Sequence, residues 1–317
     1  MPHPFKPLNL NRIKTYSLQE RKSKVGIEDF AKPWAEGGTL RGFLETLPGI
    51  LAGGHIREVV AAIALAQRNS KTVLIGMGAH VIKVGLNPVI IDLMERRVIS
   101  AVAFNGAGII HDVELAIAGK TSEDVDSSLN EGSFGMSRDT CEFINEAIKK
   151  TKRKPYGLGK AVGEAIVKNG LLFQRISILA AGIRLGIPIT VHVAFGTDIL
   201  HMHPGFDPNL TGKATHADFR LFASAVATLE GGVYVNVGSA VILPEVFLKA
   251  LTLARNLGHT VKRFTTVNMD YMLQYRPLTN VVHRPTAEGG VGYNLIGHHE
   301  IMLPLIAAGV IEAIKNQ

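Results

Sequence analysis

Apolar residues recur along this chain in two alternating patterns from about residue 37 onward. Short apolar runs rich in β-branched residues predict strands, and the segments between them carry apolar residues at helical spacing. Strands that are apolar throughout and alternate with helices are typical of a mostly parallel sheet with helices on both faces. We therefore predict a Rossmann-like α/β fold with strands within residues 71–78, 99–108, 187–195, 231–240 and 261–269.

The first 36 residues follow neither pattern. They are polar and contain prolines, which predicts an N-terminal arm that needs a partner surface to become ordered. Residues 37–317 show no clear boundary and are predicted to form one domain. Near its start, two helical patterns are separated by Gly53 and Gly54, where we expect a break. Residues 120–137 are polar and predict a long loop.

Composition narrows the setting of the protein. Apolar residues make up 46% of the chain, yet no uncharged apolar stretch is long enough to span a membrane. Cys141 is the only cysteine, which fits a reducing cytosol, so we expect a cytoplasmic protein without a membrane partner. The formal net charge of +7 comes largely from residues 12–24 and 149–154. We interpret these runs as solvated surfaces rather than as a nucleic-acid interface, because no aromatic residues are interleaved with them.

Glycines gather at the carboxyl ends of the predicted strands, where open parallel sheets bind ligands. A glycine there lets backbone N–H groups approach a phosphate, and a following helix N-terminus favours an anion. The pattern suggests a dinucleotide or a similar phosphate ligand, although tight turns explain it equally well. The candidate cofactor-binding residues at these ends are Gly76, Gly78, Ala79, His80, Asn105, Gly106, Ala107, Gly108, Gly238 and Ser239.

Histidines and aspartates accumulate at the same ends, most densely in HVAFGTDILHMHP, residues 192–204. In a strand, the spacing of His201 and His203 would place both rings on one face. Such a pair can bind a metal, line the pocket of an organic ligand or hydrogen-bond the backbone. Because the spacing matches no established zinc pattern, we assign no metal ligand, and a metal-dependent hydrolase or lyase remains an alternative.

Several segments, taken in order, resemble the deoxyhypusine synthase family between about residues 25 and 315. VLIGMGAHVIKVG is similar to its first nucleotide-binding turn, VNVGSAVILPEV to a later glycine-rich turn, and RPLTNVVHRP to the start of its RPDEAxxWGK segment. TVHVAFGTDILHMHP and GSAVILPEVFLKAL resemble a bacterial deoxyhypusine synthase-like branch more closely still. VGIEDF and FNGAGIIHDVE occupy the places of two further family segments.

This resemblance implies a Rossmann-like sheet that binds NAD and a homotetramer with active sites at subunit interfaces. It implies a polyamine or small-amine substrate, because family members oxidise a polyamine with NAD and transfer its aminobutyl group to an amine. It also places His298 and His299 where the family has an Asp-Ala pair near the cofactor.

The sequence departs from the family at the reacting groups. The carrier lysine is missing from residues 276–285, and the paired acids after the second glycine turn become Ile110 and His111. We therefore predict an NAD-dependent enzyme that oxidises or transfers an aminoalkyl group without a lysine-imine intermediate, and a non-catalytic NAD-binding protein remains a further alternative. One histidine would be the general base, with Asp112 or Asp198 orienting it or binding an ammonium. The candidate catalytic residues are His111, Asp198, His201, His203 and His283.

Overall fold

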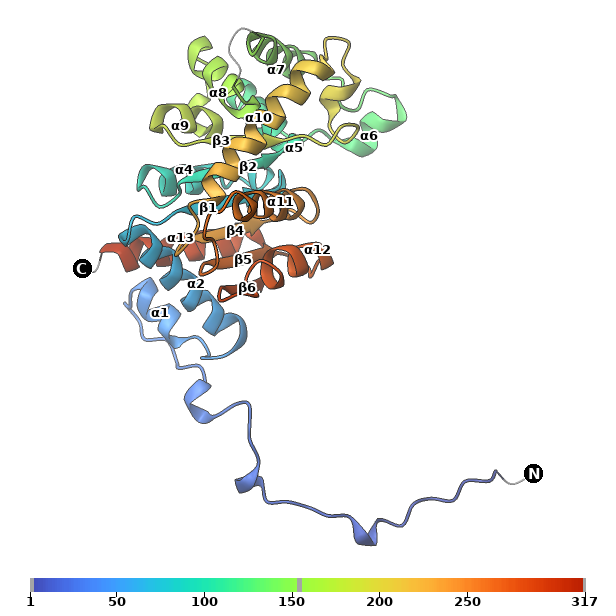
Figure 1. Ribbon diagram of the computed structural model, residues 1–317, viewed down its shortest axis with the longest axis vertical. Coiled ribbons are helices and arrows are strands. Elements are labelled where there is room, and N and C mark those ends of the chain that lie inside the picture. Colours follow the sequence, from blue (N-terminus) through green and yellow to red (C-terminus); the bar gives the residue numbers. More distant parts are fainter. Residues whose placement is uncertain (1–2, 153–155, 316–317) are drawn as a thin grey trace.

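A single parallel sheet organises the protein. The computed structural model describes residues 3–152 and 156–315, which leaves Arg153 and Lys154 of the second basic run outside the described residues. The sheet has six strands in the order β3-β2-β1-β4-β5-β6, and every neighbouring pair is parallel (Figure 1). This is the strand order of the Rossmann fold, so the predicted fold class is confirmed. The strands are β1 (Val73–Met77), β2 (Ala101–Asn105), β3 (Ile189–His192), β4 (Val233–Val237), β5 (Thr265–Asp270) and β6 (Val291–Ile296).

Successive strand residues pack against different helices, which explains why the strands are apolar throughout. Ile75 and Met77 of β1 pack into the larger core with α2 (Leu51–Arg68) and α13 (His299–Lys315). Leu74 packs on the other face, under α10 (Pro208–Val226) and α11 (Ile242–Asn256). The remaining helices are α1 (Leu40–Thr46), α3 (His80–Lys83), α4 (Asn87–Glu95), α5 (Gly106–Ala118), α6 (Val125–Asn130), α7 (Arg138–Lys150), α8 (Leu158–Asn169), α9 (Ile178–Leu185) and α12 (Tyr275–Pro277).

Strand β6 was not predicted. It forms one edge of the sheet and its sequence, VGYNLI, includes a glycine and an asparagine. Its residues are mostly exposed or partly buried, whereas the residues of β1 and β4 are all buried. An edge strand of this kind lacks the continuous apolar run on which the prediction of the other strands rested.

The expected break at Gly53 and Gly54 is wrong, because α2 runs through both glycines. A Cβ on Gly54 would lie 2.8 Å from the carbonyl oxygen of Gly49, so a close backbone approach accounts for this glycine. The chain turns earlier, between the end of α1 and Leu51. The segment 120–137 is also not wholly a loop, since it contains α6.

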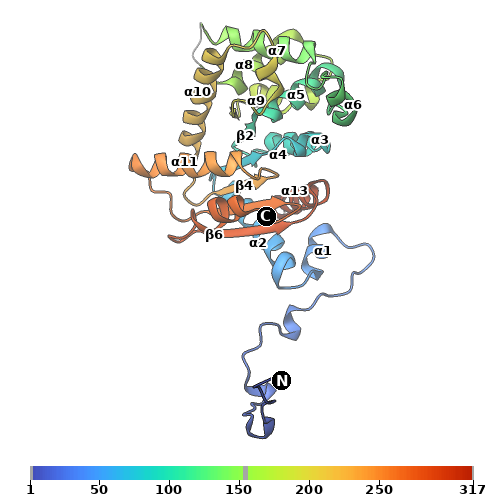
Figure 2. The ribbon, with the colours of Figure 1, turned by 90° about the vertical axis from the view of Figure 1, so that its right-hand side faces the viewer.

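The N-terminal arm extends away from the sheet and its helices (Figures 1 and 2). It forms three short 3₁₀ turns, Leu10–Arg12, Leu18–Glu20 and Ile27–Asp29, and the large side chains of Phe5 and Leu8 are exposed. The described part of the chain contains no helix that is both long and apolar enough to cross a membrane.

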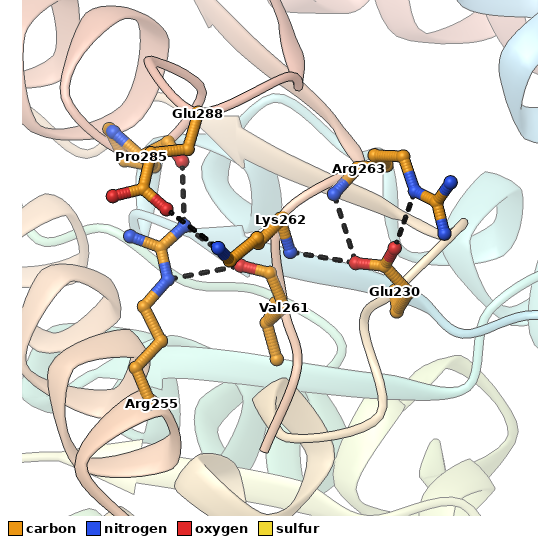
Figure 3. A network of polar contacts seen from close by, with 7 residues as sticks. All are labelled: Glu230, Arg255, Val261, Lys262, Arg263, Pro285 and Glu288. Carbon is orange, nitrogen blue, oxygen red and sulfur yellow. Dashed lines mark hydrogen bonds and ion pairs between the residues drawn. The ribbon is translucent and has the colours of Figure 1, made fainter. Parts of the chain in front are cut away.

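The ends of the strands form two edges with different roles. At the amino edge, where β4, β5 and β6 begin, Glu230 accepts hydrogen bonds from the backbone N–H groups of Lys262 and Arg263 at 2.7 and 2.9 Å (Figure 3). Arg255 donates to the carbonyl oxygens of Val261 and Pro285. These contacts tie the loops before β5 and β6 together, so we interpret the amino edge as structural.

Candidate functional site

The carboxyl edge contains a topological switch point between β1 and β4. The chain proceeds from β1 to β2 and β3 on one side and then returns to β4 on the other side of β1. The backbones of Gly78 and Gly238 meet there: Gly78 donates to the carbonyl oxygen of Val237 at 2.9 Å, and a Cβ on Gly78 would lie 2.1 Å from the Gly238 oxygen. Gly238 also has a φ of 63°. Both glycines are therefore required by the backbone at the place where such sheets bind ligands.

Two histidines from distant parts of the sequence meet at this point. The rings of His80, at the start of α3, and His299, at the start of α13, have centroids 5.6 Å apart. His299 is 1% exposed, and its Nδ1 has no hydrogen-bond partner among the described residues. Burial lowers the pKa of His299, which favours the neutral ring. His298 instead is exposed and lies 3.7 Å from Glu300.

A ladder of three asparagine side chains, of which Asn236 and Asn268 are buried, holds the glycine turn after β4, and the sequence did not lead us to predict it. Asn236, Asn268 and Asn294 are aligned across β4, β5 and β6, with Nδ2 to Oδ1 distances of 2.8 and 2.7 Å. Asn236 Nδ2 also donates to the carbonyl oxygen of Ser239 at 2.9 Å, which fixes the turn after β4. The available signal was the repeated asparagine in YVNVG, TVNMD and GYNLI.

The start of α5 faces a carboxylate of the chain itself. Asn105 caps this helix, accepting from the N–H of Gly108 at 3.0 Å. A Cβ on Gly106 would lie 1.8 Å from Asp198 Oδ2, so the carboxylate packs directly on the first residue of α5. The positive end of the helix dipole favours an anion at this position. Of the glycine-rich ends, the one at residues 105–108 thus already has an anion beside it.

Asp198 is buried, yet it retains an open oxygen. The residue is 9% exposed, and Oδ2 has no hydrogen-bond partner in the described part of the chain. Burial raises the pKa of Asp198 to about 6. A partly desolvated carboxyl group with an open oxygen can bind a cation or a hydrogen-bond donor.

His201 and His203 lie in the same loop as Asp198, and both rings hydrogen-bond the backbone instead of forming a pair of metal ligands. His201 Nδ1 accepts from the N–H groups of Gly196 and Asp198 at 3.1 and 3.2 Å. His203 Nδ1 accepts from the N–H of Gly205 at 3.2 Å. The Nε2 of His201 has no hydrogen-bond partner among the residues described. This nitrogen and Asp198 Oδ2 are the two buried side-chain atoms of the loop that have no hydrogen-bond partner among the described residues, and we call them open in this sense.

The remaining candidates, His111, Asp112 and His283, have different surroundings. His111 lies on α5, with Nδ1 2.6 Å from Thr121 Oγ1. Asp112, one residue later, is fully buried and accepts hydrogen bonds from the groups around α9, so it serves the structure. His283 ends the π-helical turn η6 (Leu278–His283), and the chain then enters the contacts of Pro285 at the amino edge. The structure therefore does not bring His283 to the carboxyl edge.

The described residues contain no group of three histidine, cysteine, aspartate or glutamate side chains placed to hold a metal ion. In residues 192–204, Nδ1 of His201 and Nδ1 of His203 accept hydrogen bonds from backbone N–H groups, and Asp198 Oδ2 faces Gly106. The geometry consequently does not favour the metal-dependent alternative.

Two hollows of the surface lie elsewhere. A cavity of about 390 Å³ lies beside edge strand β3, between α8 and α9. A second cavity, of about 550 Å³, lies between α7 and α8. Neither is lined by the glycine-rich strand ends, so the candidate site is defined by its open polar atoms and by the switch point rather than by these cavities.

Comparison with known proteins supports the fold. No family model matches the sequence, and no curated protein matches it. Among solved structures, AgrE in a ternary complex with ornithine and NAD⁺ is 15% identical, with a TM-score of 0.53 over 81% of this chain. ArgZ, an arginine dihydrolase of the cyanobacterial ornithine-ammonia cycle, is 16% identical with a TM-score of 0.53 over 81% of this chain. The match covers 33% of each of those two chains.

A putative deoxyhypusine synthase from Entamoeba histolytica matches over nearly its whole length. It is 11% identical, with a TM-score of 0.51, and the match covers 90% of this chain and 97% of that one. The resemblance seen in the sequence is thus supported as a distant relationship of fold, and identities this low show nothing finer.

Proposed function

We propose that this protein is an NAD-dependent enzyme that oxidises a small amine or polyamine, or transfers its aminoalkyl group, without a lysine-imine intermediate. The observation that carries the proposal is the buried, open Oδ2 of Asp198 beside the start of α5. A carboxylate removed from water needs a partner of opposite charge, and a substrate ammonium supplies both the charge and the hydrogen bond. The open Nε2 of His201 would contact the same substrate.

The cofactor would lie over the switch point, against Gly78, Gly238 and Ser239, with His80 and His299 at its side. Ligands of open parallel sheets bind at such a point, and AgrE, which has this fold, was solved with NAD⁺. A bound nicotinamide would accept hydride from the carbon that bears the amine. We also propose, from the family resemblance, a cytoplasmic homotetramer in which another copy completes each site.

The absence of a carrier lysine follows from the sequence and agrees with the geometry. Residues 276–285 contain no lysine, and their last part lies at the amino edge. Lys83 ends α3 and is exposed. The described part of the carboxyl edge therefore supplies a carboxylate and histidines as its reactive groups, which suits direct oxidation of the amine.

The test is formation of reduced nicotinamide when the protein, NAD and one member of a panel of diamines and polyamines are mixed. We expect turnover with at least one amine. Asp198→Asn should lower kcat/KM by about 100-fold or more, because the amide cannot neutralise the ammonium. Glu230→Gln, at the amino edge, is the matched control and should leave kcat/KM unchanged. NAD binding without turnover of any amine would instead support the non-catalytic alternative.

A further inference from the structure

The candidate histidines differ in the ring nitrogen that carries the proton. A ring nitrogen that accepts an N–H hydrogen bond has no proton, so the neutral ring carries its proton on the other nitrogen. Nδ1 of His201 and Nδ1 of His203 both accept from backbone N–H groups. Both rings therefore present Nε2–H, a donor, and neither can accept a proton without losing its backbone contact.

His111 has the opposite arrangement. Thr121 Oγ1 lies 2.6 Å from His111 Nδ1 and donates to Glu114 Oε2 at 2.5 Å. The hydroxyl has one proton, which goes to the carboxylate, so the contact with the ring requires a proton on Nδ1. The Nε2 of His111 then holds a lone pair.

Glu114 is ionised at neutral pH, as this arrangement requires. Burial acts to raise its pKa, but hydrogen bonds from His111 and Thr121 outweigh burial and lower the pKa below its usual value. Glu114 Oε2 also lies 3.4 Å from His111 Nδ1. The three side chains thus form a chain of donors that ends on a negative charge.

The position of His111 fits a role at the carboxyl edge. Ala107 and Gly108, at the start of α5, lie one turn before His111 on the same face of the helix. The His111 side chain is 18% exposed, so a ligand can reach it.

We infer that His111 Nε2 is the general base of the proposed reaction, and that Thr121 and Glu114 are positioning residues that hold its proton on Nδ1. This inference rests on the proposed function. The substrate ammonium gives one proton to Nε2. The lone pair of the free amine would favour loss of hydride from its carbon to give an iminium ion, and a bound nicotinamide would supply the hydride acceptor. The imidazolium formed on His111 is stabilised through Thr121 by the charge of Glu114.

A purely structural role would also explain these contacts, because Thr121 begins the segment that folds back along α5. Such a role would give the same tautomer of His111, so the effect of Thr121 on kcat, and not the tautomer, separates a base from a structural residue. The hydrogen-bond arrangement itself is tested by ¹⁵N NMR of the histidine rings in the full chain, which separates a protonated from an unprotonated ring nitrogen. We expect Nδ1–H at His111 and Nε2–H at His201 and His203, which are internal controls.

Two variants make the test specific. Thr121→Val removes the hydroxyl, whereas Thr121→Ser keeps it. Both variants keep Glu114 Oε2, 3.4 Å from His111 Nδ1, so the Nδ1–H tautomer should persist in both. In the amine assay, Thr121→Val should lower kcat about 10- to 100-fold with little change in KM, and Thr121→Ser should restore it. Nε2–H at His111 in the unmodified protein, or an unchanged kcat in Thr121→Val, would overturn the inference.

The same spectra separate this inference from the proposed function. If His111 carries Nδ1–H but neither NAD nor any amine changes the ring signals of the histidines at the strand ends, the hydrogen-bond arrangement of His111, Thr121 and Glu114 is confirmed and the proposed function is wrong. If NAD and amines bind and turn over while His111 carries Nε2–H, the function stands and another group is the base.

Discussion

Asp112 and Asp198 are both buried carboxylates close to α5, and burial raises the pKa of each to about 6. Their surroundings nevertheless differ. The oxygens of Asp112 accept hydrogen bonds from Asn87 Nδ2, Ser177 Oγ and the backbone N–H groups of Ile178 and Leu179. Asp198 keeps Oδ2 open within the described chain. Burial alone therefore does not identify a functional acid, whereas a buried carboxylate oxygen that has no partner and lies beside a glycine-rich strand end is a candidate for binding a ligand.

The two edges of the sheet repeat this contrast. At the amino edge, Glu230 is held by two backbone N–H groups and by Arg263 (Figure 3). At the carboxyl edge, the open atoms of Asp198, His201 and His299 lie near the glycine turns. The paired polar groups at the amino edge stabilise the fold, whereas the polar atoms without partners at the carboxyl edge are where we expect a ligand to bind.

The largest expected effect on stability comes from Asp112→Asn. The new amide can offer only one oxygen to the donors around α9, and its NH₂ group faces donors instead of acceptors. We expect the free energy of unfolding to fall by ~2–4 kcal/mol. Urea unfolding should show a lower midpoint with an unchanged m-value. A loss below ~1 kcal/mol would mean that Asp112 is not the structural group described here.

Asp198→Asn should instead raise the free energy of unfolding. Burial raises the folded pKa of Asp198 from 3.8 to about 6, so between these values the folded state keeps a proton that the unfolded state has lost. Stability from this group therefore falls as pH rises through that window. The amide removes this penalty, so we expect the variant to gain ~1 kcal/mol at neutral pH and nothing near about pH 4.

Asp112 and Asp218, whose pKa values burial also raises, titrate in the same range, so the informative quantity is the difference between Asp198→Asn and the unmodified protein. Urea unfolding at several pH values measures it. A variant that loses stability at neutral pH would show that Asp198 stabilises the fold, and would remove the contrast with Asp112.

The smallest effect is expected from Glu230→Gln. Backbone N–H groups of Lys262 and Arg263 lower the pKa of Glu230 to about 2, so its contribution is present above the unfolded pKa and is lost as pH falls toward 2. We expect a loss of ~0.5–1 kcal/mol at neutral pH that disappears in acid, since this side chain is partly exposed. Chemical unfolding across pH tests this, and a change in NAD affinity in this variant would contradict the separation of the two edges.

The sequence predicted the sheet better than the site. Buried strands with helices on both faces leave a continuous apolar run, which predicted five strands, including the edge strand β3. Strand β6 leaves no such run because its residues are mostly exposed or partly buried. The switch-point glycines were found because close backbone approach admits no other residue. Asn236 was missed because its role depends on the register of β4 with β5.

The histidines show the limit of reasoning from sequence spacing. His111, His201 and His203 were all candidates for the general base. Their protonated ring nitrogens differ, because backbone N–H groups donate to Nδ1 of His201 and His203 whereas Thr121 contacts Nδ1 of His111. The spacing of histidines in the sequence does not reveal these partners. His283 was grouped with these histidines because RPLTNVVHRP resembles the start of the RPDEAxxWGK segment, yet η6 carries the chain back to the amino edge.

Binding of NAD at the carboxyl edge is tested most directly by thermal unfolding of the protein with and without NAD. A ligand at ~100 times its Kd stabilises the folded state by ~2.7 kcal/mol. For a chain of this length the midpoint should rise by roughly 2–4 °C, equally in the unmodified protein and in Glu230→Gln. An unchanged midpoint at millimolar NAD would contradict the account.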